Sequence, residues 1–563
     1  MALSREDQLA RDILDFDQQM VDVKVQYEPV FRDIIDYVIT HQPSVSKNTT
    51  QGQPRGQLQF DGTPRSALNI FTNGIHALMV APTMRWFKLG ISDEDINQLP
   101  EVKIWLQDTE ERLYKAFQRS NFYSEMKSYI KDGGSIGTAC MYSEEDIATG
   151  KIFFTTIPIR EFMIAENQYK VIDRVHREFE LTARQLKDKF GEENLTHEMQ
   201  VALNDVNASR RLQKFKILHV VFPRKDSDDR KIGQLNKPFA SIWLSLSSDK
   251  HSGSTSPPQR EGKILGEKGY DEFPYSIWRF DKETDELYGR SPAWHILSEI
   301  IGAHVLEKDL LKAAELFVNP PMNVHTNMKG KFRRKPGGIN YFKDPDEKAD
   351  AMDLKINYPV GIEQQDRKRN IINSAYFVDF FLLITSRDTT MTATEVLELQ
   401  GEKIAILAPI VTSLSSEALD QNIDRVFSIE FNAGRLLDPP PVLAGQQIDI
   451  DYIGPLAQAQ RRAFETQGII KSLENARSII ELFPQTADNV DWDGVARDVL
   501  QGGGFPEKHI IPEQIVLENR QVRQEQEAAL EETLNNETQS KTLKNVALAD
   551  KAVDGKISEA VAQ

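Results

Sequence analysis

Cysteine is almost missing from this chain of 563 residues, in which Cys140 is the only example. A single cysteine cannot form an internal disulfide, and such sparse use is typical of a protein that folds in a reducing cytoplasm. Long apolar runs are missing as well, because no stretch approaches the roughly 18 uncharged apolar residues that a membrane helix needs. The N-terminal segment MALSREDQLARDILDFD contains no apolar core of the signal-peptide kind. We therefore expect neither export nor a membrane span.

Motifs that carry enzymatic chemistry are also missing. The segment GGSIGT at 133–138 lacks the Gly-Lys-Ser/Thr ending of a phosphate loop, so a helix-terminating turn is the better interpretation. The histidines are never paired at metal-ligand spacing, and there is neither a G-x-S-x-G motif nor a cysteine close to a histidine. Carboxylate pairs such as Asp449 and Asp451 are common by chance in so acidic a chain. The sequence therefore predicts no catalytic residues, no metal and no cofactor: the protein is not expected to be an enzyme.

Positive charge is in short supply, since the formal net charge is −17. Domains that grip DNA are usually basic, because neutralising phosphate supplies much of their affinity. On bulk charge alone this protein should repel DNA. A protein that lets DNA slide past, by contrast, has reason to be acidic.

A chain of this length is too long for one hydrophobic core, so several structural regions are expected. In the first half, apolar spacing, Pro and Gly predict helices at 4–41, 64–80 and 99–131. Runs rich in β-branched and aromatic residues predict strands within 137–180 and 213–280, with a short helix at 181–190 between them. Polar loops are expected at 42–58 and 249–262.

Helices return in the second half. Ser291 and Pro292 are typical of a helix start, and this helix is expected to reach residue 317. A compact segment at 318–360 and another helix at about 362–380 follow. After a polar break, a long helix is expected at 394–428, begun by a capping box at Thr392 and kinked at Pro409. From Asp449 onward the chain is expected to be mostly helical. The fold class is therefore α+β, mainly helical.

Two basic clusters stand out from the acidic background. One contains Lys329, Lys331, Arg333, Arg334 and Lys335, and the other contains Arg367, Lys368 and Arg369. Each is either a solvated face with intrachain ion pairs or a surface that contacts phosphate or an acidic partner. Three further polar residues recur every four positions in 292–317 and form either a solvated stripe or one that faces a lumen: His304, Lys308 and Lys312. The first half of that helix is apolar on nearly every side, which suggests packing between neighbours.

Ten fragments, in order from about residue 20 to 515, resemble the head-to-tail connecting (portal) proteins of short-tailed phages. They are FDGTPRSALNIF (60–71), APTMRWFKL (81–89), SNFY (120–123), IGTACMY (136–142), FELTARQLKDKFG (179–191), YGRSPAW (288–294), EKDLLKAAE (307–315), PPMNV (320–324), TATEV (392–396) and IGPLAQAQR (453–461). Each fragment alone is weak evidence for the family, but ten fragments in the order that the family has them are highly specific for it. The loop at 249–262 and the polar C-terminal tail are not covered.

The resemblance implies a portal fold with wing, stem, clip and crown, assembled as a ring. Its parts would be a wing at 1–290, stem helices at 291–317 and 361–380, a clip at 318–360, a tunnel loop at 381–393, a long wing helix and return at 394–470, a crown at 471–515 and a polar helical tail at 516–563. Channel-facing candidates would be Arg387, Lys308, Lys312 and Lys368. Candidates for partner docking would be the five cations at 329–335. For Arg387, a surface turn in which it pairs with Asp388 or with a neighbouring subunit is an equal alternative.

The family also implies partners. Twelve copies would form a ring at one capsid vertex of the virion after assembly in the host cytoplasm. Double-stranded DNA would pass through it during packaging and ejection, and the ring would dock the terminase large subunit, a tail adaptor protein, and the major capsid and scaffold proteins. A ring-forming tail adaptor or scaffold protein is the alternative function, followed by a packaging hydrolase.

Overall fold

In a computed structural model the chain forms two compact units, 1–460 and 461–563. In the first unit the structure describes residues 5–40, 42, 56–146, 148–205, 212–225, 233–248, 260–324, 350–351, 358–385 and 406–454. In the second it describes 492–496, 515–516, 519–523, 526 and 541. There, a bidentate ion pair joins the Arg520 guanidinium to the Asp493 carboxylate at 2.6 and 2.7 Å.

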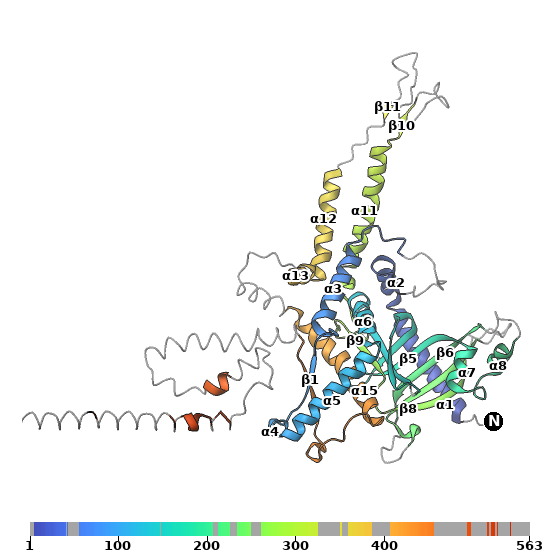
Figure 1. Ribbon diagram of the computed structural model, residues 1–563. Coiled ribbons are helices and arrows are strands. Elements are labelled where there is room, and N and C mark those ends of the chain that lie inside the picture. The colour runs from blue at the N-terminus through green and yellow to red at the C-terminus, as the bar shows by residue number, and fades with distance from the viewer. Residues whose placement is uncertain are drawn as a thin grey trace, which may run out of the picture. The chain divides into compact units, whose positions relative to one another are not determined.

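The first unit contains runs of helices and runs of strands (Figure 1). Its named helices are α1 (Arg5–Val25), α2 (Glu28–Tyr37), α3 (Thr63–Met79), α4 (Glu94–Asn97), α5 (Pro100–Arg119), α6 (Phe122–Ile136), α7 (Ala183–Phe190), α8 (His197–Asn204), α10 (Pro292–His295), α11 (Leu297–Val318), α12 (Tyr358–Ala375), α13 (Val378–Thr385) and α15 (Asp420–Asn432). Short 3-10 turns are η1 (Ile159–Glu161), η2 (Gln234–Asn236) and η6 (Pro441–Leu443), and η5 (Ser415–Leu419) is a π-helical turn.

The strands are β1 (Phe87–Ile91), β2 (Thr138–Asp146), β3 (Lys151–Ile157), β4 (Phe162–Glu166), β5 (Ile172–Thr182), β6 (Lys214–Pro223), β7 (Phe239–Ser248), β8 (Arg260–Tyr270), β9 (Tyr275–Arg279), β10 (Met322–Asn323), β11 (Asp350–Ala351) and β12 (Ile448–Tyr452). The chain is thus a mixture of helix and strand, in keeping with the predicted α+β class. The predicted helices near 64–80 and 181–190 and the two strand regions are confirmed.

Two of the predicted long helices are each broken in two. The helix expected at 4–41 consists of α1 and α2, because the chain turns at Gln26–Tyr27 and Pro29 occupies the first turn of α2. The helix expected at 99–131 consists of α5 and α6, which are separated by Ser120 and Asn121. The Ser120 hydroxyl accepts a hydrogen bond from the Phe122 N–H at 3.1 Å and so starts the new helix.

The glycines of GGSIGT do not end the helix where the sequence predicted. Gly133 and Gly134 lie inside α6, which continues to Ile136, and Gly137 at φ 98° is the left-handed residue that ends it. The two internal glycines make room for aromatic packing, because a Cβ on Gly133 would collide with Trp278 and one on Gly134 would crowd Phe71. They belong to the main core, where α3 and α6 pack together.

A five-stranded antiparallel sheet of order β4-β5-β6-β7-β8 lies between two helical layers. Its alternating side chains divide between two cores. On one face, Ala10, Ile13 and Leu14 of α1 pack on side chains that include Leu218 and Val220. On the other face, α7 and α8 pack on side chains that include Ile217 and Trp243. The sequence places the strands correctly, but β8 begins at Arg260, inside the loop expected at 249–262.

A three-stranded antiparallel sheet has the order β3-β2-β9, so β3 is an edge strand. Side chains of α6 and its N-terminal junction cover that edge. Asn121 donates to the Phe154 carbonyl at 2.7 Å and accepts from the Phe154 N–H at 2.9 Å. Glu125 accepts from the Thr156 N–H at 2.9 Å. Three of the polar backbone groups that this edge would offer to another strand are thereby occupied.

Two long helices, α11 and α12, run side by side in opposite directions (Figure 1). Ser291 caps α10 by accepting the Trp294 N–H at 3.1 Å, which confirms the predicted helix start. A break at Ile296 then separates α10 from α11. Within the segment expected to be compact, β10 pairs with β11. The helix expected at 362–380 is really α12 and α13, with Phe377 at φ 54° between them, and α13 reaches Thr385, inside the expected tunnel loop.

The described part of the long helix runs from 406 to 432 and contains the π turn η5. The capping box at Thr392 lies outside the described residues, as does the chain immediately before the helix, so the kink at Pro409 stays a prediction. The expectation of helix from Asp449 onward is wrong at its start. Residues Ile448–Tyr452 form β12, which pairs in antiparallel register with β1, Phe87 opposite Tyr452.

Candidate functional site

The α11–α12 pair is anchored to the rest of its unit by a buried polar cluster around His304. The His304 Nδ1 accepts the Asp61 backbone N–H at 3.0 Å, and its Nε2 donates to the Tyr37 carbonyl at 2.8 Å. Both ring nitrogens are therefore used by a neutral imidazole. Burial lowers the pKa of His304, although its hydrogen bond to Tyr37 opposes that shift. The sequence predicted that His304 faces solvent or a lumen in a polar stripe with Lys308 and Lys312. That prediction is wrong for His304, because its side chain is buried and only 1% exposed.

Asp61 connects α3 to both long helices. Its carboxylate accepts from the Thr63 N–H at 2.8 Å, from Arg369 Nε at 2.9 Å and from the Gln365 amide. Burial alone would raise the pKa of the Asp61 carboxyl, but the hydrogen bonds from Thr63 and Arg369 outweigh it and lower that pKa. Arg369 also donates to Glu307 of α11 at 3.0 Å. These contacts fix α12 against α11 and against the start of α3.

The structure places three of the predicted channel-facing cations on these helices. The Lys308 ammonium lies 5.3 Å from the centroid of the Phe60 ring. Lys312 is exposed and lies 3.4 Å from the Asp309 carboxylate. Lys368 donates to Glu299 at 2.7 Å. Carboxylates partly offset the charge of Lys312 and Lys368, whereas the neighbour of Lys308 is an uncharged aromatic ring.

The remaining predicted site residues lie outside the described residues. They are Arg387 and the clip cations Lys329, Lys331, Arg333, Arg334 and Lys335.

Apolar side chains remain in solvent along the outer parts of the same helices. On α11, Leu311 is 54% exposed, Phe317 74% and Val318 86%. On α12, Val360 and Ile362 are exposed as well. Within one subunit α11 buries only a few side chains, those of Ile300, Ala303 and His304. The sequence placed the apolar surface in the first half of this helix, whereas Leu311, Phe317 and Val318 lie in its second half.

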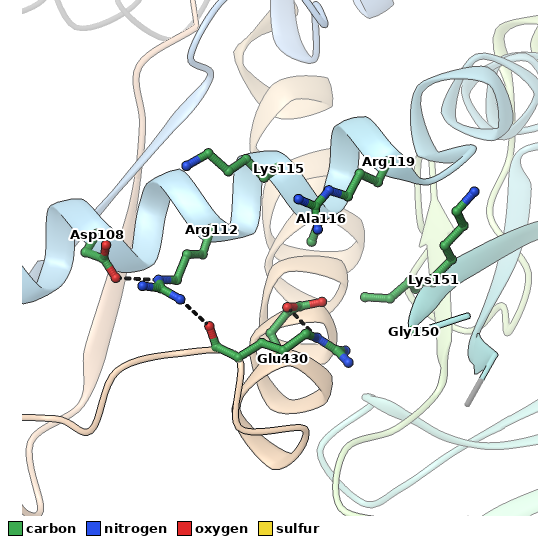
Figure 2. A pocket seen from close by; sticks show the side chains of 10 residues that line it. Asp108, Arg112, Lys115, Ala116, Arg119, Gly150, Lys151 and Glu430 are labelled. Atoms are coloured by element: carbon green, nitrogen blue, oxygen red, sulfur yellow. Dashed lines mark hydrogen bonds and ion pairs between the residues drawn. The ribbon is translucent and has the colours of Figure 1, made fainter. Parts of the chain in front are cut away.

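A second site that the sequence did not reveal is a cationic pocket of about 420 Å³ between α5, the β2–β3 turn and the segment around Arg435. Figure 2 shows α5 contributing Arg112, Lys115 and Arg119, with Lys151 on β3 across from them. Arg435 completes the five cations, while Asp108 and Glu430 are the lining carboxylates. No local signal marks this pocket, because its residues come from three separate stretches of chain.

Two arginines in this cationic pocket are held rigidly. Arg112 donates to Asp108 at 2.5 Å and to the Arg435 carbonyl at 2.7 Å. Arg435 donates to Glu430 and to Glu145, each at 2.8 Å. Lys115 has only a loose pair with Glu111, at 3.7 Å. Within the described part of the chain, Arg119 and Lys151 have no ion pair.

Catalytic groups do not gather at either place. Among the residues that the structure describes, no cluster of three or more His, Cys, Asp or Glu could hold a metal ion. Cys140 is fully buried, and burial raises the pKa of its thiol far above the ordinary value, so the reactive thiolate is suppressed. No helix in the described ranges is both long and apolar enough to cross a membrane.

Comparison with known proteins places nearly the whole chain in one family. A family model described as bacteriophage head to tail connecting protein matches residues 12–511. The portal protein of Salmonella phage epsilon15 is 27% identical over 521 residues, which cover 91% of this chain and 90% of that protein. The probable portal protein of Bordetella phage BPP-1 is 26% identical over 523 residues, covering 90% of each.

Proposed function

This chain belongs to the family of bacteriophage head to tail connecting proteins, and from that premise we propose that copies of it form a ring through which DNA enters and leaves the phage head. Its role is that of a portal protein, the connector between head and tail in the virion, with capsid and tail proteins as its partners.

The observation that carries the ring proposal is the exposed apolar surface of α11 and α12. In a single subunit Leu311, Phe317 and Val360 face water, although burying side chains of this kind is worth about 1.5–3 kcal/mol each. Neighbouring copies that pack beside the helix pair would cover them. A repeated head-to-tail contact that closes on itself produces a ring, and the resemblance sets the expected number at twelve.

The polar cluster at Asp61 and His304 supports a fixed orientation for this helix pair. Because the cluster ties α11 and α12 to α2 and α3, the pair cannot pivot freely. In a ring, twelve such pairs would surround one channel. We propose that Lys312, Lys308, Lys368 and Arg387 face the DNA there. Asp309 and Glu299 partly neutralise Lys312 and Lys368. This suits a channel wall along which DNA slides, because strong contacts to phosphate would hold the DNA in place.

Docking is proposed for the clip. The cations at 329–335 would bind acidic surfaces of the terminase large subunit during packaging and of a tail adaptor protein afterwards. The major capsid protein and the scaffold protein would contact the ring during head assembly in the host cytoplasm. No catalytic step is assigned to this chain.

Purified full-length protein tests the ring directly. We expect native mass spectrometry to find a closed oligomer of about twelve copies, and negative-stain images to show a ring with a central opening. Neighbours bury the apolar stem surface, so the assembly should persist on dilution. A stable monomer at micromolar concentration would overturn the proposal.

A further inference from the structure

The cationic pocket holds charges that its own subunit leaves unused. In the part of the chain that is described, Arg119 and Lys151 have no carboxylate partner, and Lys115 has only the loose pair with Glu111. Phe153 follows Lys151 by two residues on β3, so both side chains project from the same face of the strand, and both are exposed. Among the described residues, the pocket thus presents two cations without an ion pair, while the exposed ring of Phe153 lines a separate pocket with Tyr142 and Trp243.

The pocket is also preorganised. Gly150, at φ 64°, ends the β2–β3 turn, and its N–H donates to the Asp146 carbonyl at 2.7 Å. The Asp146 carboxylate accepts from the Thr149 hydroxyl at 2.7 Å. Together with the anchored Arg112 and Arg435, this turn fixes the rim of the pocket before any ligand binds. Binding of an acidic partner would therefore cost little conformational entropy in the pocket.

An acidic patch of matching character lies on two neighbouring loops elsewhere in the same unit. Asp281, Glu283 and Asp285 are exposed, and among the described residues Glu283 and Asp285 have no ion pair. The adjacent β4–β5 hairpin loop presents Tyr169, which is 76% exposed, and Val171.

The two loops of the acidic patch are joined into one rigid surface. Lys170, at φ 62°, donates from Nζ to the Thr284 carbonyl at 2.8 Å. Asn167 accepts the N–H groups of Tyr169 and Val171 at 2.9 and 3.1 Å. The acidic patch therefore combines the exposed carboxylates of Asp281, Glu283 and Asp285 with the Lys170 ammonium, which is held at the Thr284 carbonyl.

These two patches lie at opposite ends of the three-stranded sheet. At one end, Thr138 pairs with Arg279, whose guanidinium reaches the Lys170 carbonyl at 3.3 Å. At the other end, Asp146 pairs with Lys151. Along the length of β2 this separation is about 26 Å. One subunit therefore cannot bring its own patches together, and a head-to-tail contact requires such a pair of unlike surfaces on different sides.

We propose that the acidic patch of one copy docks on the cationic pocket of the next, so that Glu283 and Asp285 face Arg119 and Lys151 across the contact. The inference rests on the proposed ring and adds a second contact to the apolar one along α11 and α12. Opposite charges steer the approach of two copies and disfavour wrong registers. Because these charges lie at the surface, added salt weakens this contact far more than the apolar one.

Disulfide crosslinking tests the juxtaposition in the full-length protein. Cys140 is buried and its thiolate is suppressed, so it adds little background. We expect Lys151→Cys with Asp285→Cys to give a ladder of linked dimers, trimers and larger species on mild oxidation. Lys103→Cys with Asp285→Cys is the matched control, since Lys103 is exposed on the same helix as Arg119 but about 24 Å along it.

Charge reversal supplies a second measurement. Arg119→Glu with Lys151→Glu, or Glu283→Lys with Asp285→Lys, should raise the subunit concentration at half assembly roughly tenfold, because attraction becomes repulsion. The quadruple variant carries both reversals and should return close to wild type, which also shows that the reversed chains fold. Lys103→Glu should change little.

The outcomes separate the two proposals. Suppose that the wild type forms a ring. If the Lys151–Asp285 cysteine pair then gives no more crosslinked ladder than the Lys103 control, or if the two charge reversals do not compensate each other, this inference is wrong and the ring proposal is unaffected. Absence of a ring in the wild type overturns the proposed function itself. Reversals that spare the ring but abolish binding of an acidic protein would assign the cationic pocket to that partner and refute contact between copies.

Discussion

Asp61 is the residue on which the anchoring of the long helices depends most. Replacing it with alanine removes the acceptor for Thr63, Gln365 and Arg369 at a position that is 5% exposed. Buried donors without an acceptor are costly, so we expect Asp61→Ala to lower the free energy of unfolding by about 1–3 kcal/mol. Urea unfolding measures the loss. Asp366→Ala is the control, because Asp366 is a second, exposed partner of Arg369 and should cost less than about 0.5 kcal/mol.

His304 gives the same region a pH dependence. Burial lowers the pKa of the folded-state imidazole below its ordinary 6.5. As the pH falls, the unfolded chain therefore binds a proton at this histidine at a higher pH than the folded protein does. The contribution of His304 to the free energy of unfolding is complete above pH 6.5 and declines as the pH falls toward the folded-state pKa.

The expected result is a lower melting temperature at pH 5 than at pH 7, with a smaller difference in His304→Gln, whose amide does not titrate. Residual dependence is expected from His176 and His219, whose pKa values burial also lowers. His295 is a surface histidine and serves as the control. If His304→Gln and His295→Gln melt with the wild-type pH dependence, the imidazole is not the sensor.

Charged side chains could be found from the sequence, but their partners could not. Lys308, Lys312 and Lys368 were visible as cations on predicted helices. Yet Lys368 is 69 positions from Glu299, and Asp61 is 308 positions from Arg369. Such contacts arise only when the fold brings distant segments together, and no local pattern encodes them. For the same reason the cationic pocket was not predicted.

At the scale of elements, α6 depends on two glycines that lie where a helix would prefer alanine. Gly133→Ala should improve helix propensity, but its Cβ would collide with Trp278, which is fully buried and cannot move freely. We expect a net loss of about 1–3 kcal/mol in the free energy of unfolding. Gly90→Ala in β1 is the control, because its Cβ would enter open space. Equal stability of the two variants in urea would contradict this account of α6.

Helix positions were easier to predict than helix ends. Apolar spacing placed helical character in α1, α5, α6 and α12, because each has a face that packs on a core. The breaks were missed where single residues decide them, at Tyr27 before Pro29 and at Phe377 with its positive φ. For β12 the error has another cause. Its residues, IDIDY, form a strand because β1 is there to pair with them.

At the scale of the whole molecule, the basic clip would be a surface for partners. We expect the triple change Lys331→Glu, Arg333→Glu and Arg334→Glu to leave rings intact and to weaken binding of the terminase large subunit and of the tail adaptor at least about tenfold. Pull-down of each partner on purified rings measures this. Arg184→Glu, an exposed cation on α7, is the control. Normal docking by the triple variant would reduce the cluster to a solvated face.

The covered edge of β3 has a consequence for how copies meet in an infected cell. Strand addition is close to irreversible, because every backbone group in the new pair is used at once. Asn121 and Glu125 occupy three of those groups on β3, the N–H and carbonyl of Phe154 and the N–H of Thr156, so strand addition at this edge is disfavoured. If copies assemble into a ring as proposed, a copy that arrives in the wrong place would not be trapped by strand pairing along β3, and it could leave again before the circle closes.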